Sequence, residues 1–345
     1  MGITDYLVLP FKGVLKSISS YRFFTGLAKN KTSKCSKILK NSKSLHGLEE
    51  VYTGLSPIHV IIRENKEDLL KVLLQRKDAD KYINLQENKL KWAPIHFASS
   101  NGSVSILNHL LPYRPNLLIK TQEGLSPIHI ASGKGYIDFV LKLLENGVHI
   151  DERDSNNWTA LHYAASQDFI ELIEKLLQKG AKTAFTDKNG LTPLFAAILH
   201  GHINSVQLLY KYKDGHKGES PLRCIHWAAG LQDSSILEWL FNQGEDLKQV
   251  DNSGAKNTAL HFATLGKSGQ SIKFLLKKGF DINVTDSKGS SALHIATIEQ
   301  DQDIIKILCE NGAKVTLQND EGLCPLDIAE SLRNSRLEIL LKRYK

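Results

Sequence analysis

The chain has 345 residues, of which 41% are hydrophobic and 23% are charged, a composition typical of folded domains and not of disordered or collagen-like chains. No run of about 18 apolar residues occurs, so the sequence predicts no transmembrane helix. The four cysteines are far apart and none forms a CxxC pair, which argues against a disulfide framework or a zinc site and favours a reducing, intracellular setting.

The net charge of +7 is concentrated at the N-terminus. Residues 1–45 contain nine Lys or Arg residues and one acid, Asp5, so this segment carries +8 and the rest of the chain carries −1. We define residues 1–45 as a basic N-terminal arm. An affinity for an anionic membrane or for nucleic acid is therefore expected of the arm alone.

The arm contains one amphipathic stretch. Its apolar residues fall at helical spacing, with Lys12 and Lys16 on the opposite face: Phe11, Val14, Leu15, Ile18 and Tyr21. Three interpretations stay open. The first is attachment to an anionic membrane. The second is an organelle-targeting presequence, although such presequences favour Arg and this arm has one. The third is a flexible arm, or a helix that caps the folded region after it.

From residue 56 onward, a short motif recurs about every 33 residues. Its nine copies read SPIHVI, APIHFA, SPIHIA, TALHYA, TPLFAA, RCIHWA, TALHFA, SALHIA and CPLDIA, and they begin at Ser56, Ala93, Ser126, Thr159, Thr192, Arg223, Thr258, Ser291 and Cys324. The start-to-start spacings are 37, 33, 33, 33, 31, 35, 33 and 33 residues. A period of this kind predicts an array of structural repeats.

Each repeat predicts two short helices. Ser or Thr at the first motif position caps the first helix, and Pro at the next position suits its first turn. Counted from the first motif residue, offset 2 is aliphatic in all nine repeats and offset 5 is Ala in eight, so both lie on one helix face. The second helix carries Leu at offset 17 in every repeat: Leu73, Leu110, Leu143, Leu176, Leu209, Leu240, Leu275, Leu308 and Leu341.

One such helix pair cannot bury its apolar faces alone, whereas stacked repeats bury a continuous core. The sequence therefore predicts an all-α solenoid of stacked helix-turn-helix repeats joined by short hairpin loops. We expect about nine repeats over residues 46–345, arranged as a single elongated array.

These motifs resemble the ankyrin-repeat family, whose typical repeat carries a TPLHxAA string, a later LL pair and a GADVN hairpin. The clearest matches are the segments 192–197 and 275–283, and the resemblance covers roughly residues 50–345. Three departures stand out. Phe195 and Asp327 replace the usual His, the 37-residue spacing predicts an enlarged connection around residues 78–90, and residues 210–222 lack a clean hairpin signal, which predicts a disturbed superhelix there.

Seven of the thirteen histidines lie at offset 3: His59, His96, His129, His162, His226, His261 and His294. Metal ligation or acid–base catalysis is one interpretation, but their repetition favours a structural hydrogen bond at each helix start. The Gly266-Lys-Ser268 string is similar to the end of a phosphate loop, yet His261 stands where that loop needs glycine. No other catalytic motif occurs. We therefore expect no enzyme, cofactor, metal or small-molecule substrate.

Aromatic residues suggest where a partner binds. Trp92 and Trp158 directly precede a repeat motif, which in this family lies near the hairpin tip; they are either binding anchors or packing against the adjacent hairpin. We expect Trp227 in the core and Trp239 in partly buried packing. Asn283 lies in a hairpin where some family members are hydroxylated, although a turn-stabilising role is favoured.

Offsets 7 and 8 vary from repeat to repeat, and the resemblance places them on a concave groove. Three apolar residues at these offsets, Leu199, Leu231 and Ile298, suit an apolar partner segment. The candidate partner-binding residues are Trp92, Asn101, Leu125, Lys134, Trp158, Gln167, Leu199, His200 and Leu231.

The resemblance implies a non-catalytic protein-interaction module, such as an adaptor, scaffold or inhibitor. An enzyme that carries repeats for targeting needs a catalytic domain, and only the 45-residue basic arm lies outside the array. The alternative is a membrane-associated or targeted repeat protein, for example a pathogen effector, whose basic arm carries localisation. We expect a protein partner and a cytoplasmic location, with membrane or nuclear association left open, and no nucleic acid.

Overall fold

The computed structural model describes residues 18–42, 45, 55–212, 224–251 and 254–345. Within these ranges the chain is helical, and an isolated bridge between Thr285 and Ser291 is its one β-type pairing. None of the described helices is long and apolar enough to cross a membrane.

All nine repeats form the predicted helix pair, and every first helix begins one residue after the first motif residue. The first helices are α3 (Pro57–Arg63), α6 (Pro94–Asn101), α8 (Pro127–Ser132), α10 (Ala160–Ser166), α12 (Pro193–Leu199), α14 (Cys224–Gly230), α16 (Ala259–Leu265), α18 (Ala292–Ile298) and α20 (Pro325–Ser331). The second helices are α4 (Glu67–Leu74), α7 (Val104–Leu110), α9 (Ile137–Glu145), α11 (Ile170–Gln178), α13 (Ile203–Lys211), α15 (Ser235–Asn242), α17 (Gly269–Lys277), α19 (Gln302–Glu310) and α21 (Ser335–Lys342). The all-α repeat fold is therefore confirmed.

The core consists of the positions that repeat in the sequence. The Leu at offset 17 and the Ala at offset 5 are at most 1% exposed wherever they occur, as for Leu143 and Ala131 in the third repeat. A small residue at offset 5 allows successive first helices to pack closely. Replacing one of these leucines by Ala removes contacts on both sides of its repeat, a change that costs about 2–5 kcal/mol in well-packed cores.

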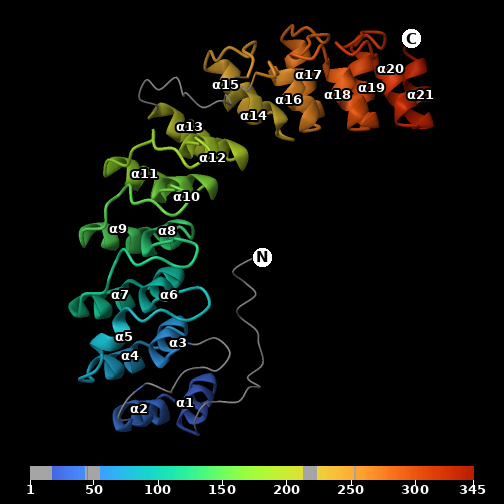
Figure 1. Cartoon of the computed structure of the whole chain (residues 1–345). Coiled ribbons are helices and arrows are strands. Elements are labelled where there is room, and N and C mark those ends of the chain that lie inside the picture. The colour runs from blue at the N-terminus through green and yellow to red at the C-terminus, as the bar shows by residue number, and fades with distance from the viewer. Residues whose placement is uncertain (1–17, 43–44, 46–54, 213–223, 252–253) are drawn as a thin grey trace. The chain divides into compact units, whose positions relative to one another are not determined.

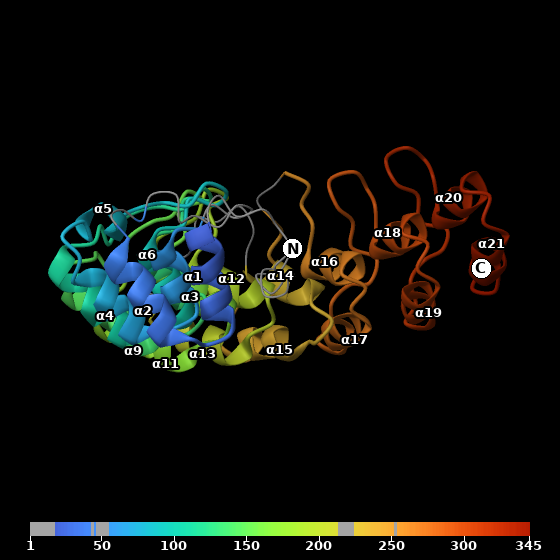
Figure 2. The same ribbon diagram turned by 90° about the horizontal axis from the view of Figure 1, so that it is seen from below.

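The helices form two compact units. The first comprises the described residues through Ala164 together with Glu174–Ala181, and the second comprises Ala165–Ile173 and Lys182–Lys345. In the first unit α3, α6 and α8 pack in succession, with α4, α7 and α9 beside them (Figure 1). In the second unit α14, α16, α18 and α20 pack in succession, and Figure 2 shows them on one side with α17, α19 and α21 on the other. The single array over residues 46–345 stays a prediction.

The connection after the first repeat contains an extra helix. The 37-residue spacing predicts an enlarged segment at residues 78–90, and α5 (Asp80–Ile83) lies there with Tyr82 and Ile83 buried. A 3-10 helix, η2 (Leu111–Tyr113), extends α7 in the second repeat. Most of the segment 210–222 lies outside the described residues.

Part of the basic arm forms a helix pair. Helices α1 (Ile18–Ala28) and α2 (Thr32–Asn41) pack on each other, and α2 packs on α4 (Figure 1). Their buried side chains are Phe23, Phe24, Leu27, Cys35 and Leu39. Of the predicted apolar face, Phe11, Val14 and Leu15 lie outside the described residues, whereas Ile18 and Tyr21 fall within α1.

Arg76, at the end of the first repeat, fixes this helix pair. Its Nη1 donates to the carbonyl oxygens of Leu39 and Ser42, the latter at 2.9 Å, while its Nε and Nη2 donate to Asp78 at 2.8 and 2.9 Å. The Arg76 guanidinium holds the pKa of the Asp78 carboxyl below its usual value. Charge-assisted bonds of this kind are stronger than neutral ones, so α2 is firmly attached to the first repeat.

Candidate partner-binding surface

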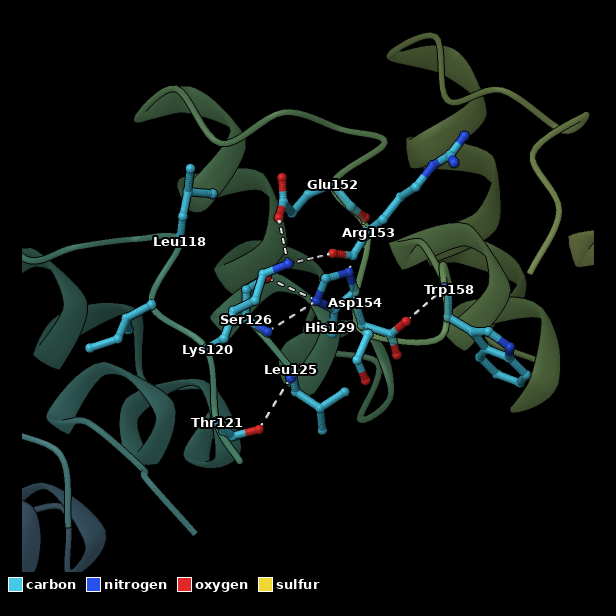
Figure 3. Close-up of polar contacts among 12 residues, drawn as sticks. Leu118, Lys120, Thr121, Leu125, Ser126, His129, Glu152, Arg153, Asp154 and Trp158 are labelled. Atoms are coloured by element: carbon cyan, nitrogen blue, oxygen red, sulfur yellow. Dashed lines mark hydrogen bonds and ion pairs between the residues drawn. The ribbon is translucent and has the colours of Figure 1, made fainter. Parts of the chain in front are cut away.

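The histidines at offset 3 are buried structural groups. In the third repeat the Ser126 N–H donates to His129 Nδ1 at 3.1 Å, and His129 Nε2 lies 3.0 Å from the carbonyl oxygen of Glu152 (Figure 3). Because a backbone N–H can only donate, Nδ1 is the acceptor and Nε2 carries the proton. Equivalent contacts are made by His59, His96, His261 and His294. The predicted structural hydrogen bond is confirmed for these residues.

Burial lowers the pKa of His96, His129, His261 and His294 and so favours their neutral form. For His96 the pKa falls to about 4. A neutral imidazole with both nitrogens bonded to backbone has no free lone pair or proton for acid–base catalysis or metal binding. In the part of the chain that the structure describes, no group of three His, Cys, Asp or Glu residues has the geometry of a metal site.

The two departures from His have local replacements. In the ninth repeat Asp327 Oδ2 accepts the Cys324 N–H at 2.8 Å, in place of an imidazole nitrogen. In the fifth repeat the Phe195 N–H donates to Thr192 Oγ1 at 3.4 Å, so the helix is capped by the threonine alone. The Gly266–Ser268 string forms no phosphate loop, because Gly266 ends α16 and the buried Ser268 begins α17.

A buried acid shapes the hairpin before the fourth repeat. Asp154 Oδ1 accepts the N–H groups of Asn156 and Trp158 at 2.7 and 2.8 Å, and its Oδ2 accepts the Tyr163 hydroxyl at 2.8 Å. Asp187 makes the same turn contacts with Asn189 and Leu191 in the next hairpin. These bonds hold the hairpin backbone in one conformation, so residues at the tips have fixed positions.

Trp92 and Trp158 both pack against their own repeat. The Trp92 ring lies 5.1 Å from that of Phe97, and the Trp158 ring lies 5.1 Å edge-on from that of Tyr163. Both tryptophans are half-buried. Packing therefore holds one side of each ring, while their role as binding anchors stays a prediction.

The other candidate residues of the first unit differ in their surroundings. Leu125 and Lys134 are half-buried. Asn101 is exposed, but its Nδ2 donates to the carbonyl oxygens of Ile62 and Arg63 at 2.8 and 3.1 Å, which ties α6 to the end of α3. The sequence did not indicate this structural role, because the acceptors lie 39 and 38 residues earlier in the chain.

Beside Leu125, the hairpins carry a basic and apolar edge. Lys120 Nζ donates to the carbonyl oxygen of Arg153 at 2.9 Å and lies 3.6 Å from Glu152 Oε1 (Figure 3). Leu118, just before it, is 47% exposed. Neither Lys120 nor Leu118 was among the predicted binding residues, since hairpin tips carry no repeated motif of their own.

The four remaining candidates lie in the second unit. Gln167 and His200 are exposed, whereas Leu199 and Leu231 are half-buried. His200 Nδ1 lies 2.9 Å from the Ala196 carbonyl oxygen, so this ring contributes to the end of its own helix.

The second unit also presents a row of exposed apolar side chains at offsets 7 and 8, which we name the apolar row. It consists of Leu265, Ile298 and Leu332, which are 47%, 52% and 40% exposed. They end α16, α18 and α20, which pack in succession, so the three side chains belong to adjacent repeats. Ile298 was predicted to be an apolar residue of the groove, whereas Leu332 was not predicted to lie at the surface.

A hollow of about 490 Å³ lies beside Ile298, the middle residue of this row. Ile298, Leu323 and Ile328 provide its apolar lining, and Lys288, Asp320 and Glu321 provide charged groups. The hollow can therefore accept an apolar side chain with polar neighbours.

Trp227 and Trp239 pack within the second unit. The Trp227 ring lies 6.2 Å from that of Phe195 and 6.4 Å from that of Phe262. Trp227 is half-buried and its indole Nε1 is buried, so its side chain lies only partly in the core where it was predicted. Trp239 packs edge-on against Tyr210 at 5.0 Å, in the partly buried position that was predicted. In the hairpin between the seventh and eighth repeats, Asn283 Oδ1 accepts the Lys314 N–H at 2.9 Å, so this side chain links its hairpin to the next one.

Helix pairs stacked on one another and joined by hairpins, with surface side chains that differ between repeats, define a helical-repeat protein. A family model described as ankyrin repeats (3 copies) matches residues 58–154, 95–184, 128–221 and 225–342. The chain therefore belongs to the ankyrin-repeat family. Ankyrin repeats are general protein–protein interaction modules and are typically not enzymes.

Solved structures of ankyrin-repeat domains show the same fold. The human ASB11 ankyrin repeat domain is 24% identical with a TM-score of 0.57, and the match covers 64% of this chain and 98% of that domain. The ankyrin repeat domain of Bcl-3, a member of the IkappaB protein family, is 24% identical with a TM-score of 0.51, covering 64% and 100%. A search of curated protein sequences finds no match.

Proposed function

We propose that this chain is a non-catalytic adaptor, scaffold or inhibitor that binds another protein, and that the apolar row of the second unit is its main contact. The observation that carries the proposal is the exposure of Leu265, Ile298 and Leu332 in three adjacent repeats. Contiguous exposed apolar side chains are typical of protein interaction sites.

The fold does not require these apolar residues. The equivalent offsets in the first unit hold polar or small residues, among them Ser100, Asn101 and Lys134, and the helices α6 and α8 form there without an apolar side chain at these offsets. An apolar side chain at offset 7 or 8 therefore contributes to binding and not to the repeat core. The partner is expected to present a segment with apolar side chains along one face, one of which enters the hollow beside Ile298.

The hairpin tips of the first unit are a second proposed contact. Trp92, Leu125 and Trp158 are half-buried, so each offers part of its apolar surface to a partner. Aromatic residues of this kind are enriched among residues that dominate binding energy. We propose a cytoplasmic setting, which agrees with the free thiols of Cys35, Cys309 and Cys324.

Affinity capture compared between matched variants tests the main contact. The test variant is Leu265→Ser/Ile298→Ser/Leu332→Asn, whose new residues occur at offsets 7 and 8 elsewhere in the chain. The control is Ile339→Ser, because Ile339 is 58% exposed on a second helix, α21, outside the apolar row. Proteins captured from lysate by the wild type and the control, but lost by the triple variant, support the proposal. Equal capture by all three proteins contradicts it.

A further inference from the structure

The helix pair α1 and α2 presents a basic face without acidic neighbours. From Ile18 to Ser42 the chain has no Asp or Glu, and its basic residues are all exposed: Arg22, Lys29, Lys31, Lys34, Lys37 and Lys40. None of them forms an ion pair with any residue in the described part of the chain. We name these six residues the basic cap.

The acids of the adjacent helix do not neutralise the basic cap. On α4, Glu67 Oε2 accepts the Ser105 hydroxyl at 2.7 Å, and Asp68 lies 3.9 Å from Lys71. Both acids therefore interact with residues of the first and second repeats.

The lysines of α2 lie on one side of the helix. Lys34, Lys37 and Lys40 follow each other at a spacing of three residues, opposite the buried Cys35 and Leu39. The side that carries Cys35 and Leu39 packs on α1 and α4, so the lysine side faces solvent at the end of the stack (Figure 1). The bonds of Arg76 to α2 keep this face in a fixed orientation.

We propose that the basic cap binds the surface of a bilayer that contains anionic phospholipids. Clusters of four to eight Lys or Arg residues attract such surfaces, and the attraction is purely electrostatic where no apolar group inserts. Phe23, Phe24, Leu27 and Leu39 are buried in the packing of the two helices, so these side chains do not insert. This inference is independent of the protein partner proposed for the second unit.

The composition of the basic cap favours lipid over nucleic acid. Single-stranded nucleic acid is bound in basic grooves with aromatic side chains for stacking, and specific duplex contacts rely on Arg. The basic cap has one Arg and five Lys, and two aromatic residues beside it, Phe23 and Phe24, are fully buried. A row of flexible lysines on an exposed helix face suits a planar layer of phosphate groups.

The test is cosedimentation of the full chain with phosphatidylcholine vesicles, prepared with and without phosphatidylserine, at low and high salt. The variant is Lys34→Gln/Lys37→Gln/Lys40→Gln. The control is Lys273→Gln/Lys277→Gln/Lys314→Gln, which removes the same charge from exposed lysines of the second unit. Circular dichroism checks that both variants are folded.

We expect the wild type and the control to bind only vesicles with phosphatidylserine, and to lose binding as salt rises. Each lysine near an anionic surface contributes about fivefold to partitioning, so the variant is expected to bind about 100-fold more weakly. Equal binding by the folded variant overturns the proposal. So does a wild type that ignores phosphatidylserine and instead binds a DNA duplex or polyglutamate through the same lysines.

Discussion

Replacing Gly266 by Ala adds one methyl group at a place where two helices of the second unit approach closely. A Cβ built at Gly266 lies 2.0 Å from the carbonyl oxygen of Gly230 and 2.6 Å from its Cα. Both are backbone atoms, so no side-chain rotation relieves the overlap, and α14 and α16 must move apart. Gly266 itself has φ −76°, a conformation that Ala adopts freely, so the expected cost is steric alone.

Overpacking of this kind costs about 1–3 kcal/mol, and we expect the upper part of that range because only backbone can move. Gly133→Ala is the matched control. Gly133 also ends a first helix, with φ −67°, but its added Cβ meets its nearest atoms at 3.4 Å. We expect that control to change the free energy of unfolding by less than about 0.5 kcal/mol.

Hydrogen–deuterium exchange of peptides that cover α14 and α16 measures the effect locally, which is needed because repeat arrays do not always unfold in one step. A loss of about 3 kcal/mol raises the exchange of the most protected amides by roughly 100-fold. If exchange in Gly266→Ala equals that of the wild type, or if Gly133→Ala is equally affected, the close approach of the two helices is not a source of strain.

Three further changes test the structure. Lowering the pH from 6.5 to about 4 is expected to reduce the free energy of unfolding by up to about 3 kcal/mol through His96. The reason is that the His96 ring takes up a proton below pH 6.5 in the unfolded chain but stays neutral where it is buried in the folded chain. Urea titrations across this pH range measure the change in the free energy of unfolding. Asn101→Ala removes two bonds to carbonyl groups of α3 and is expected to cost about 1–2 kcal/mol by urea unfolding, whereas Lys134→Ala at the same offset changes little. Arg76→Met removes the bonds to Leu39 and Asp78, and limited proteolysis is expected to cleave α1 and α2 first.

For each of these three predictions, one experimental result would contradict the reasoning. A free energy of unfolding that rises as the pH falls from 6.5 contradicts a neutral His96 in the folded state. Equal losses for Asn101→Ala and Lys134→Ala mean that the carbonyl contacts of Asn101 contribute nothing measurable. If Arg76→Met is cleaved at the same sites and rate as the wild type, α2 is held mainly by its apolar side chains.

The repeat fold could be predicted from the sequence because its determinants are local and recur. Leu at offset 17 recurs in all nine repeats, Ala at offset 5 and Pro or Ala at the helix start recur in eight, and the 37-residue spacing even indicated the place of α5. The structure adds contacts between residues that lie far apart in the chain. Arg76 bonds to α2 across 37 residues at Leu39, and no motif marks either partner.

The candidate surface was predicted only in part, for the same reason. Offsets 7 and 8 mark where surface residues occur, but exposure depends on the neighbouring repeat. Asn101 was selected as a binding residue and is bonded to the previous repeat, whereas Leu332 was overlooked and is 40% exposed. Whether the selected residues contact a partner stays a prediction.

The hydrogen bond from each offset-3 histidine to the following hairpin has a consequence for folding. His129 Nε2 bonds to Glu152, and His294 Nε2 bonds to Leu323, so the start of each of these repeats is completed only by backbone that leads into the next one. A helix pair folded without its following hairpin would leave that buried N–H without its acceptor. The start of the first helix is therefore completed only when the hairpin that leads to the next repeat has also folded.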